Sequence, residues 1–542
     1  MVSVGAVVFF VYYVAIYSVN FPFQDDNTFL QLITEIRKGL SWPETISTFF
    51  RADNDHRIFV PRFVSYIDYL INGHLNFRSY IFIAAINLIF VAGYIYGLFR
   101  QLKLPLAYFL PIPLLIFQPQ YHEVTIWALT GLQHITLLLL LCACLILLQE
   151  PSPVRVATAV FLALLATYTH GNGILVFATG FFILLINRHY VVLLPWMLAM
   201  MIALAGYLAG YTPGSGVKSS IDWPLIPAAF VAKIGATLST WPSLSIGAPI
   251  IWGTLICIVV IPSMLMAVYQ SLRKNSTQPA VAHTIFAFFC FIFLTTGLIT
   301  IYRASSEIVL ENRFKIYAAF SSVFFYLFLL ITYPKLRRGT YVFFVVFATL
   351  FYLSSYSLYT PEVVNKYTRY VADTYNWRKN QTELCNFSSI ESSIEFLVPA
   401  YQQGYWQVPE RFADFDERLK ATIRQNRFKP LVFQTKHYLH EGNGPPQLLI
   451  ETPEFPLRRR QLRDELFVVL HDETTQRTYL TGTLPKMAGW RRLLTEGVYF
   501  GNGFSTTVPL KATQPGQYRL GCLLKEAGGK SELIMTQQTV TL

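Results

Sequence analysis

The chain has 542 residues, of which 53% are hydrophobic and only 14% are charged, and its formal net charge is +12. Soluble domains carry about 25% charged residues, so the composition excludes an ordinary soluble protein and predicts a polytopic membrane protein. A basic soluble protein would suggest nucleic acid, but here short basic cytoplasmic loops explain much of the charge. We therefore expect a lipid bilayer as a partner and no nucleic acid.

The first apolar segment, residues 1–19, is long enough to cross a bilayer. It has no basic n-region and no small-residue cleavage site, so we interpret it as a retained helix and not as a signal peptide. The few residues before it suggest that the natural chain starts further upstream.

The loop after this segment, residues 20–78, contains two polar clusters. Asp25 and Asp26 form the first cluster. The second comprises Asp53, Asp55, His56, Arg57 and Arg62. Acids beside lipid can act as a general base, bind a divalent metal or hold a polar substrate, and the metal candidates are Asp25, Asp26 and His56. The alternative is that Asp25 and Asp26 only cap a following helix.

Hydropathy predicts about eleven membrane spans. They cover residues 1–19, 79–99, 104–118, 126–148, 154–169, 173–187, 190–211, 246–270, 281–302, 314–333 and 340–359. The five even-numbered turns all carry Lys or Arg, whereas two of the odd-numbered turns, 118–125 and 169–172, carry none. The positive-inside rule then predicts a cytoplasmic amino terminus, with the 20–78 loop and everything after residue 359 on the outside.

Ionisable side chains recur in the turns that this orientation places outside. They are His122, Glu123, His170, Arg303, Arg313 and Lys315. Charged groups near a membrane are costly and are functional candidates by default. His134, within the fourth span, is the deepest such group, and a single histidine there is more often a hydrogen-bonded packing residue than a catalyst. Between residues 224 and 240 we expect an interfacial helix.

After residue 359 the chain becomes polar. Residues 360–430 are expected to be mostly helical, with 383–397 and 409–425 as the best helices. Short alternating runs then predict a small external β-sandwich over residues 431–542, with strands at 447–451, 466–471, 478–483, 506–511, 516–524 and 532–541. The basic run 458–460 is interpreted as a solvated face, with a glycan or headgroup contact as the alternative. Cys385 and Cys522 could pair in an oxidising compartment.

Several common catalytic motifs are missing from the sequence. There is no GxxxxGK[ST] or GxGxxG phosphate loop, no GxSxG elbow and no HExxH motif. The energy for an external reaction must therefore come with the substrate, as a lipid-linked donor would supply it.

A first span followed at once by an external acidic pair, a large first loop, about eleven spans and an external carboxyl-terminal domain resembles the GT-C glycosyltransferases. The stretch from Asn54 to Ile58, with Pro61 and Arg62, resembles an NxHR…PR stretch of bacterial polytopic proteins that modify surface polysaccharide. The segment from Tyr405 to Glu410 is similar to their post-membrane region. The pair is Asp-Asp and not the Asp-Glu of aminoarabinose transferases, so the acceptor stays open.

This resemblance implies a transmembrane GT-C-like domain over residues 1–359, an external helical region over 360–430 and the β-sandwich over 431–542. It implies transfer of a sugar, with inversion, from a polyprenyl-phosphate or diphosphate donor to an external glycan or lipid acceptor in a bacterial inner membrane. Asp26 or Asp25 would be the general base. Substrate-binding roles would fall to Asp53, Asp55, His56, Arg57, Arg62, His122, Glu123, Arg303, Arg313 and Lys315. A divalent metal is left open.

Three other interpretations remain. A flippase for lipid-linked oligosaccharide would use the same acids and arginines to bind headgroups without chemistry. A membrane acyltransferase would need a catalytic histidine with an arginine deep in the helices, for which only His134 and His170 are candidates. A degenerate family member could instead be a scaffold of envelope polysaccharide assembly.

Overall fold

The computed structural model describes residues 2–53, 56–210, 222–273, 279–303, 308–385, 393–438, 446–455 and 461–542. The chain divides into two compact units. The helical unit comprises residues 1–15, 38–67 and 79–358, and the second unit comprises residues 16–37, 68–78 and 359–542.

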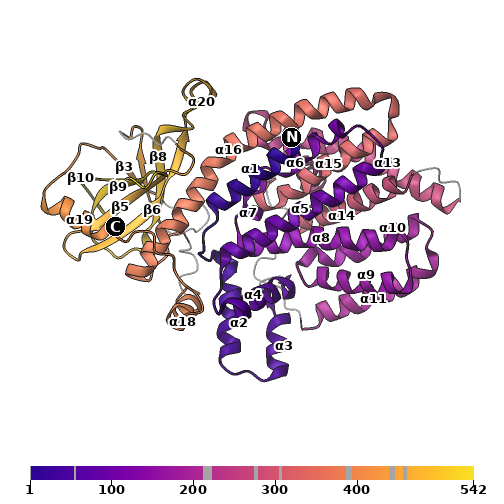
Figure 1. The fold of residues 1–542 in the computed structure, drawn as a ribbon, viewed down its shortest axis with the longest axis horizontal. Helices are drawn as coiled ribbons and strands as arrows, with labels where there is room; N and C mark the ends of the chain where they lie inside the picture. The colour runs from indigo at the N-terminus through magenta and orange to yellow at the C-terminus, as the bar shows by residue number, and fades with distance from the viewer. Residues whose placement is uncertain are drawn as a thin grey trace. The chain divides into compact units, whose positions relative to one another are not determined.

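The helical unit is built from α-helices joined by short 3₁₀ turns (Figure 1). Its first half contains α1 (Val2–Tyr17), α3 (Trp42–Phe50), β1 (Ala52–Asp53), β2 (His56–Arg57), α4 (Phe59–Asn72), α5 (Phe77–Gln101), α6 (Pro111–Ile116), α7 (His122–Thr125) and α8 (Ala128–Gln149). Its second half contains α9 (Pro153–Thr167), η4 (Gly171–Ile174), α10 (Leu175–Ile186), α11 (Tyr190–Leu208), α12 (Ile226–Ile234), η6 (Ala236–Thr240), α13 (Gly247–Leu272), α14 (Ala280–Arg303), η8 (Asn312–Phe314), α15 (Lys315–Thr332) and α16 (Arg337–Asn380). Helices α1, α4, α5 and α16 have residues in both units.

Among the described residues, seven helices are long and apolar enough to cross a membrane. They are α5, α8, α11, α13, α14, α15 and α16. Four shorter apolar helices are α1, α9, α12 and the η4–α10 segment. A multi-pass membrane protein is thus indicated, as the sequence predicted, but the count of about eleven spans is not confirmed.

The predicted third span, residues 104–118, is not one continuous helix. It contains the 3₁₀ turn η2 (Leu106–Phe109) and the six-residue helix α6. Proline at positions 105, 111 and 113 explains the break, because proline lacks the N–H that a helix interior needs. The predicted interfacial helix at 224–240 is likewise shorter, since α12 ends at Ile234 and a 3₁₀ turn follows.

Helix α15 lies at the centre of the helical unit. Every residue from Lys315 to Phe328 is buried. Phe324 stacks on Phe288 of α14 with ring centroids 4.1 Å apart. A helix that is apolar on most sides packs against its neighbours on most sides. The few polar side chains of α15 are therefore held in place by the surrounding helices.

The second unit contains η1 (Gln24–Asp26), α2 (Asn27–Arg37), the end of α16, the short helices η11 (Ser393–Leu397) and α18 (Val398–Gln402), α19 (Phe415–Arg424) and two sheets. One sheet has the strand order β10-β9-β5-β6 and the other the order β3-β4-β8-β7, and all neighbours are antiparallel. The strands are β3 (Gln434–Tyr438), β4 (Gln447–Thr452), β5 (Glu465–Asp472), β6 (Arg477–Gly482), β7 (Leu484–Met487), β8 (Phe500–Pro509), β9 (Gln517–Lys525) and β10 (Ser531–Thr541).

The inward side chains of both sheets form one core, which includes Ile450 and Phe504 from one sheet and Val468, Leu470 and Leu520 from the other. The carboxyl-terminal β region predicted from alternating runs is therefore present, and β3 and β7 are strands that the sequence analysis missed. Cys385 and Cys522 are both free thiols, so they do not pair with each other. The 458–460 run lies outside the described residues.

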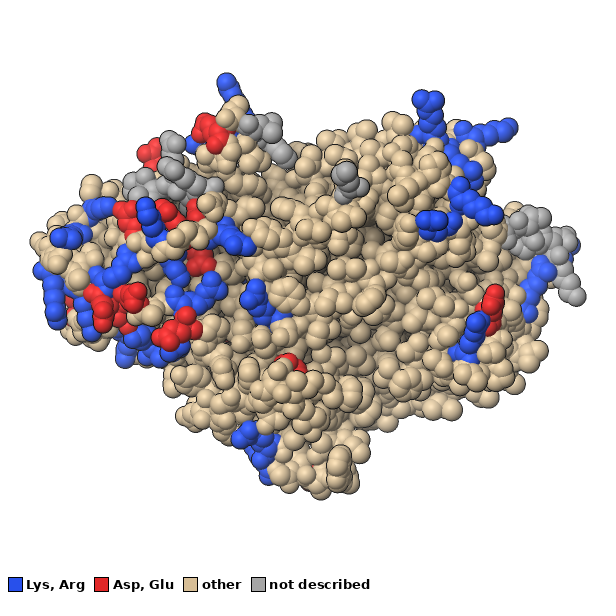
Figure 2. Space-filling view, in the orientation of Figure 1, with Lys and Arg blue, Asp and Glu red and all other residues tan. Residues whose placement is uncertain are grey.

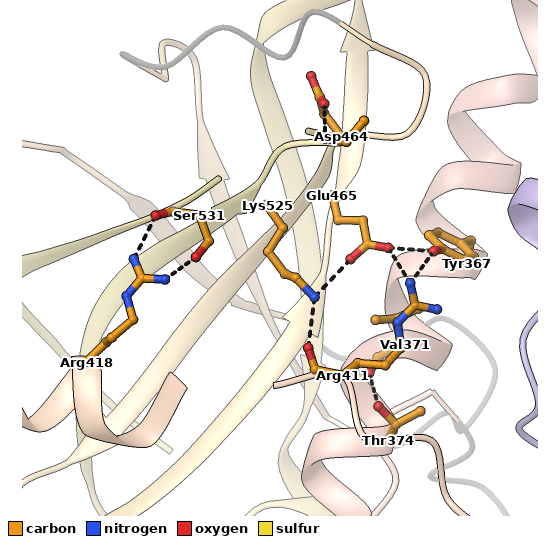
Figure 3. A network of polar contacts seen from close by, with 10 residues as sticks. Tyr367, Val371, Thr374, Arg411, Arg418, Asp464, Glu465, Lys525 and Ser531 are labelled. Atoms are coloured by element: carbon orange, nitrogen blue, oxygen red, sulfur yellow. Dashed lines mark hydrogen bonds and ion pairs between the residues drawn. The ribbon is translucent and has the colours of Figure 1, made fainter. Parts of the chain in front are cut away.

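A polar network fixes the β5 strand to the end of α16 within this unit (Figure 3). The buried Glu465 carboxylate accepts hydrogen bonds from Tyr367, at 2.5 Å, and from Arg411, at 3.0 Å. Lys525 lies 3.7 Å from its second oxygen. Because both cations share one carboxylate, this network has a structural role.

Figure 2 shows that charged side chains gather over the β-strands, whereas the visible face of the helical unit is mostly uncharged. An uncharged surface on apolar helices is compatible with a lipid bilayer as the surrounding medium.

Candidate functional site

The strongest polar cluster of the helical unit begins at His134 in α8. His134 is 1% exposed. Its Nδ1 lies 2.9 Å from the hydroxyl of Tyr317 in the central helix α15. The sequence presented His134 as an isolated deep histidine, and the fold gives it a defined partner.

The second component is the turn Thr169-His-Gly-Asn-Gly173 between α9 and α10. Asn172 donates from Nδ2 to the Tyr317 hydroxyl, at 3.0 Å, and to Thr295 of α14, at 3.3 Å. His170 Nδ1 hydrogen-bonds to Asn172 Oδ1. The turn is therefore connected to α14 and α15 through a single side-chain amide.

The two glycines of this turn are required by close approach. A Cβ atom on Gly171 would lie 2.5 Å from His56 Nδ1, and one on Gly173 would lie 1.7 Å from the Ala166 carbonyl oxygen. Any side chain at either position would displace a neighbour, because real Cβ contacts are longer than this. Gly171 thus provides the space for a third histidine.

His56, on β2, is the third imidazole of the group, and the three rings are tilted relative to one another. Its ring centroid is 4.5 Å from that of His170, and His170 is 4.6 Å from His134. We call His56, His134, His170, Asn172 and Tyr317 the histidine cluster. Of the predicted substrate-binding residues, His56 belongs to it.

Arg313, in η8, is the cation associated with the histidine cluster. Burial lowers the pKa of His170 well below its ordinary value, and the positive charge of Arg313 adds to this lowering. The neighbouring Phe314 ring packs against His134, with centroids 5.8 Å apart, and lies 5.3 Å below the Arg313 guanidinium. Within the described part of the chain, Arg313 Nε is buried and has no hydrogen-bond partner. Arg313 is therefore a cation with donor capacity left for an anionic ligand.

Other predicted residues lie along the same segment. The Arg313 backbone N–H donates to Glu123 of α7, at 3.3 Å. Lys315 is buried and donates to Asn312, at 2.8 Å. Arg303 lies 3.9 Å from Glu311, which also pairs with Lys233 at 3.3 Å. His122 is buried in α7 beside Glu123. The helical unit thus brings Glu123, Arg313 and Lys315 into one region.

Arg57 and Arg62 bind backbone carbonyls of the helical unit. Arg57 donates to the carbonyls of Tyr207, at 2.8 Å, of Phe50, at 2.7 Å, and of Ala209. Arg62 is 1% exposed and donates to the carbonyls of residues 48, 49 and 51, and its guanidinium lies 3.8 Å from Asp53. These contacts favour a role in holding the loop. Binding of substrate phosphate by Arg57 or Arg62, and of the sugar by Asp53, stays a prediction. Asp55 lies outside the described residues.

The acidic pair belongs to the second unit. Asp26 lies in η1, is 2% exposed, and its carboxylate accepts a hydrogen bond from the Phe23 backbone N–H at 3.0 Å. That bond joins Asp26 to the backbone at the start of its own turn, η1. Asp25 is more exposed than Asp26. Of the two carboxylates, Asp25 is therefore the easier one for a substrate to reach, and the base role of either stays a prediction.

A metal site was predicted only as an open question, with Asp25, Asp26 and His56 as candidates. Among the described residues, no three histidine, cysteine, aspartate or glutamate side chains are grouped so that they could hold a metal ion. His56 belongs to the helical unit, whereas Asp25 and Asp26 belong to the other unit.

Sequence reasoning did not identify Asn172, Tyr317 or Thr295. Tyr317 and Thr295 lie within apolar helices, where a single hydroxyl gives no signal. The HGNG sequence was a usable signal, because two glycines around an asparagine indicate close backbone approach.

Comparison with known proteins finds no matching family model, no similar curated protein and no similar solved structure.

Proposed function

We propose that the protein is an integral-membrane glycosyltransferase that moves a sugar from a polyprenyl-phosphate-linked donor to an extracytoplasmic glycan or lipid acceptor. The observation that carries the proposal is the buried histidine cluster beside Arg313 in an apolar helical unit. Buried polar groups are costly inside membrane proteins and are kept mainly where they serve a substrate. The acidic pair in the first loop and the resemblance to GT-C enzymes support the same reaction.

In this reaction an acceptor hydroxyl attacks the anomeric carbon of the sugar. The new carbon–oxygen bond forms as the bond from that carbon to the phosphate oxygen breaks, and the bonding electrons leave with the phosphate. The hydroxyl proton goes to a first-loop carboxylate, Asp25 or Asp26, which acts as general base. Arg303, Arg313 and Lys315 are cations of the helical unit, and their charge suits the binding of a donor phosphate.

A second candidate is transfer of an acyl group to an external polysaccharide. The specific observation in its favour is that His134, His170 and Arg313 lie in one buried region, as an acyltransferase would need. In that reaction the acceptor hydroxyl would attack the carbonyl carbon of an acyl ester or thioester donor, and the bond from that carbon to the donor oxygen or sulfur would break. A histidine would take the hydroxyl proton and return it to the departing donor group, and the first-loop acids would have no chemical role.

The test uses the purified protein in lipid nanodiscs with a panel of polyprenyl-phosphate sugars, supplemented with cell-envelope extract as a source of acceptor. Release of free lipid phosphate is followed for the wild type and for Asp25→Asn, Asp26→Asn and His170→Gln. Glu35→Gln is the matched control, because Glu35 is a nearby acid on α2 that hydrogen-bonds to Gln31.

Donor-dependent release that an Asp25→Asn or Asp26→Asn substitution abolishes, and that Glu35→Gln preserves, is the expected result. Transfer of acyl groups with both aspartate variants fully active would favour the second candidate. Lipid binding without turnover in every protein, with acceptor supplied, would contradict both and favour a flippase or scaffold.

A further inference from the structure

The histidine cluster contains a hydrogen-bond chain whose directions can be worked out. Asn172 donates both of its Nδ2 protons, one to Tyr317 and one to Thr295. Its Oδ1 can only accept, so His170 must donate to it from Nδ1. A neutral His170 then carries no proton on Nε2.

The same reasoning gives the opposite result for His134. The Tyr317 hydroxyl accepts from Asn172, and its other described partner is His134 Nδ1, so a buried hydroxyl that donates its proton gives it to His134 Nδ1. His134 Nδ1 is therefore an acceptor, and a neutral His134 carries its proton on Nε2.

This opposition does not depend on how the amide is assigned. If Asn172 is rotated by half a turn, Oδ1 accepts from Tyr317 and Nδ2 donates to His170 Nδ1. His134 then donates from Nδ1 to Tyr317, and both tautomers reverse together. While the Tyr317 proton stays within this chain of hydrogen bonds, one of the two neutral rings carries a proton on Nε2 and the other ring does not.

We infer that the Asn172–Tyr317 bridge holds His134 and His170 as neutral imidazoles of opposite tautomer, which together bind the phosphosugar headgroup of the lipid-linked donor. The inference rests on the proposed function. A phosphosugar combines anionic oxygens, which accept hydrogen bonds, with hydroxyls, which donate them. The protonated Nε2 can donate to an anionic oxygen of the phosphate, and the unprotonated Nε2 can accept from a hydroxyl of the sugar.

The surroundings of the pair fit this role. The two ring centroids are 4.6 Å apart, so a group bound by one ring lies close to the other. The positive charge of Arg313 opposes protonation of His170 and itself attracts phosphate. Gly171 leaves room for His56, whose ring centroid lies 4.5 Å from that of His170.

The direct test is nitrogen-15 NMR of histidine-labelled full-length protein in nanodiscs at neutral pH, with His134→Gln and His170→Gln used for assignment. One ring is expected to be protonated on Nδ1 and the other on Nε2. Two rings of the same tautomer, or an imidazolium at either position, would overturn the inference.

Asn172→Asp tests the bridge with little change of shape. A carboxylate accepts from both sides, so Tyr317 must donate to it and accept from His134, and both rings become protonated on Nδ1. The matched control is Asn187→Asp, because Asn187 hydrogen-bonds to His283 Nδ1 at 2.7 Å elsewhere in the unit. Unchanged tautomers of His134 and His170 in Asn172→Asp would contradict the bridge.

The ligand arm adds a hexosyl polyprenyl phosphate to the wild-type nanodiscs. Shifts of the His134 and His170 Nε2 resonances, with none at His283, are expected, and the same lipid without its sugar should shift only the protonated ring. Absence of both shifts would overturn the binding role. Failure of the proposed function alone would give a different result. The NMR spectra would then show opposite tautomers and ligand shifts, but the activity assay would show no turnover.

Discussion

The imidazole rings of His134 and His170 lie with centroids 4.6 Å apart and planes tilted by 45°, and Tyr317 and Asn172 connect their Nδ1 atoms. His134 lies in α8 and His170 in the turn before α10, so the pair exists only when α8, α10 and α15 are packed. This relationship makes the cluster sensitive to small changes in the turn that contains His170.

Gly171→Ala is expected to displace His56 from the histidine cluster, because the new Cβ would lie 2.5 Å from His56 Nδ1. Overpacking of this kind costs about 1–3 kcal/mol. The loss should appear as a lower midpoint of thermal unfolding in nanodiscs and as a shift of the His56 NMR signals.

Gly173→Ala should cost more than Gly171→Ala, because the Cβ would meet the Ala166 backbone and not a side chain that can move. Gly93→Ala is the control, since nothing lies within 4 Å of its Cβ. Equal stability of the Gly171 and Gly93 variants would contradict the packing described for the turn.

Glu465→Gln should destabilise the second unit by about 2 kcal/mol, because it leaves Arg411 and Lys525 without a shared carboxylate. Pulse proteolysis in urea on the full-length protein measures the change in the free energy of unfolding.

The matched control is Glu532→Gln. Glu532 pairs with Lys429 at 2.6 Å, but both side chains are exposed, so the expected cost is only about 0–1 kcal/mol. If the two variants lost the same stability, the buried network would have no special role.

The sandwich should lose stability when the pH falls below the ordinary histidine range. Burial lowers the pKa of His471 in β5 below 6.5, so the unfolded state binds the proton first as the pH falls. The stability that neutral His471 contributes is complete above about pH 6.5, and it is lost progressively as the pH falls towards the lowered pKa of the folded state. Hydrogen exchange of the β5 and β6 amides, corrected for intrinsic rates, reports this free energy.

His471→Gln should make that stability less dependent on pH between about 7.5 and 5.5, whatever it does to the absolute stability. His437→Gln is the control, because the His437 side chain in β3 is exposed. A wild-type and a His471→Gln protein with the same pH dependence would rule out His471 as the responsible group.

The predicted orientation can be tested by labelling single introduced cysteines on intact cells with a membrane-impermeant maleimide. Trp42 is 81% exposed in the first loop, so Trp42→Cys should react from outside. Arg155→Cys, in a predicted cytoplasmic turn, should react only after permeabilisation. The unmodified protein is the background control, because four of its six cysteines are buried. The reverse labelling pattern would invert the topology.

The sequence by itself determined that the protein is a multi-pass membrane protein with a carboxyl-terminal β region. Long apolar runs and alternating strands are local patterns, and local patterns can be recognised from neighbouring residues alone. Span boundaries were less certain where prolines interrupt an apolar run, as they do between residues 104 and 118.

Only the tertiary structure decided which polar residues act together. Tyr317 looked like one aromatic among many in an apolar helix, and its partners Asn172 and His134 come from other helices and turns. The sequence predicts Arg57 and Arg62 as phosphate ligands. The structure adds that their guanidinium groups donate to backbone carbonyls, that of Tyr207 for Arg57 and that of Arg51 for Arg62. The physical reason is that hydrogen bonds between side chains depend on distance in space, which sequence spacing does not encode once several helices pack together.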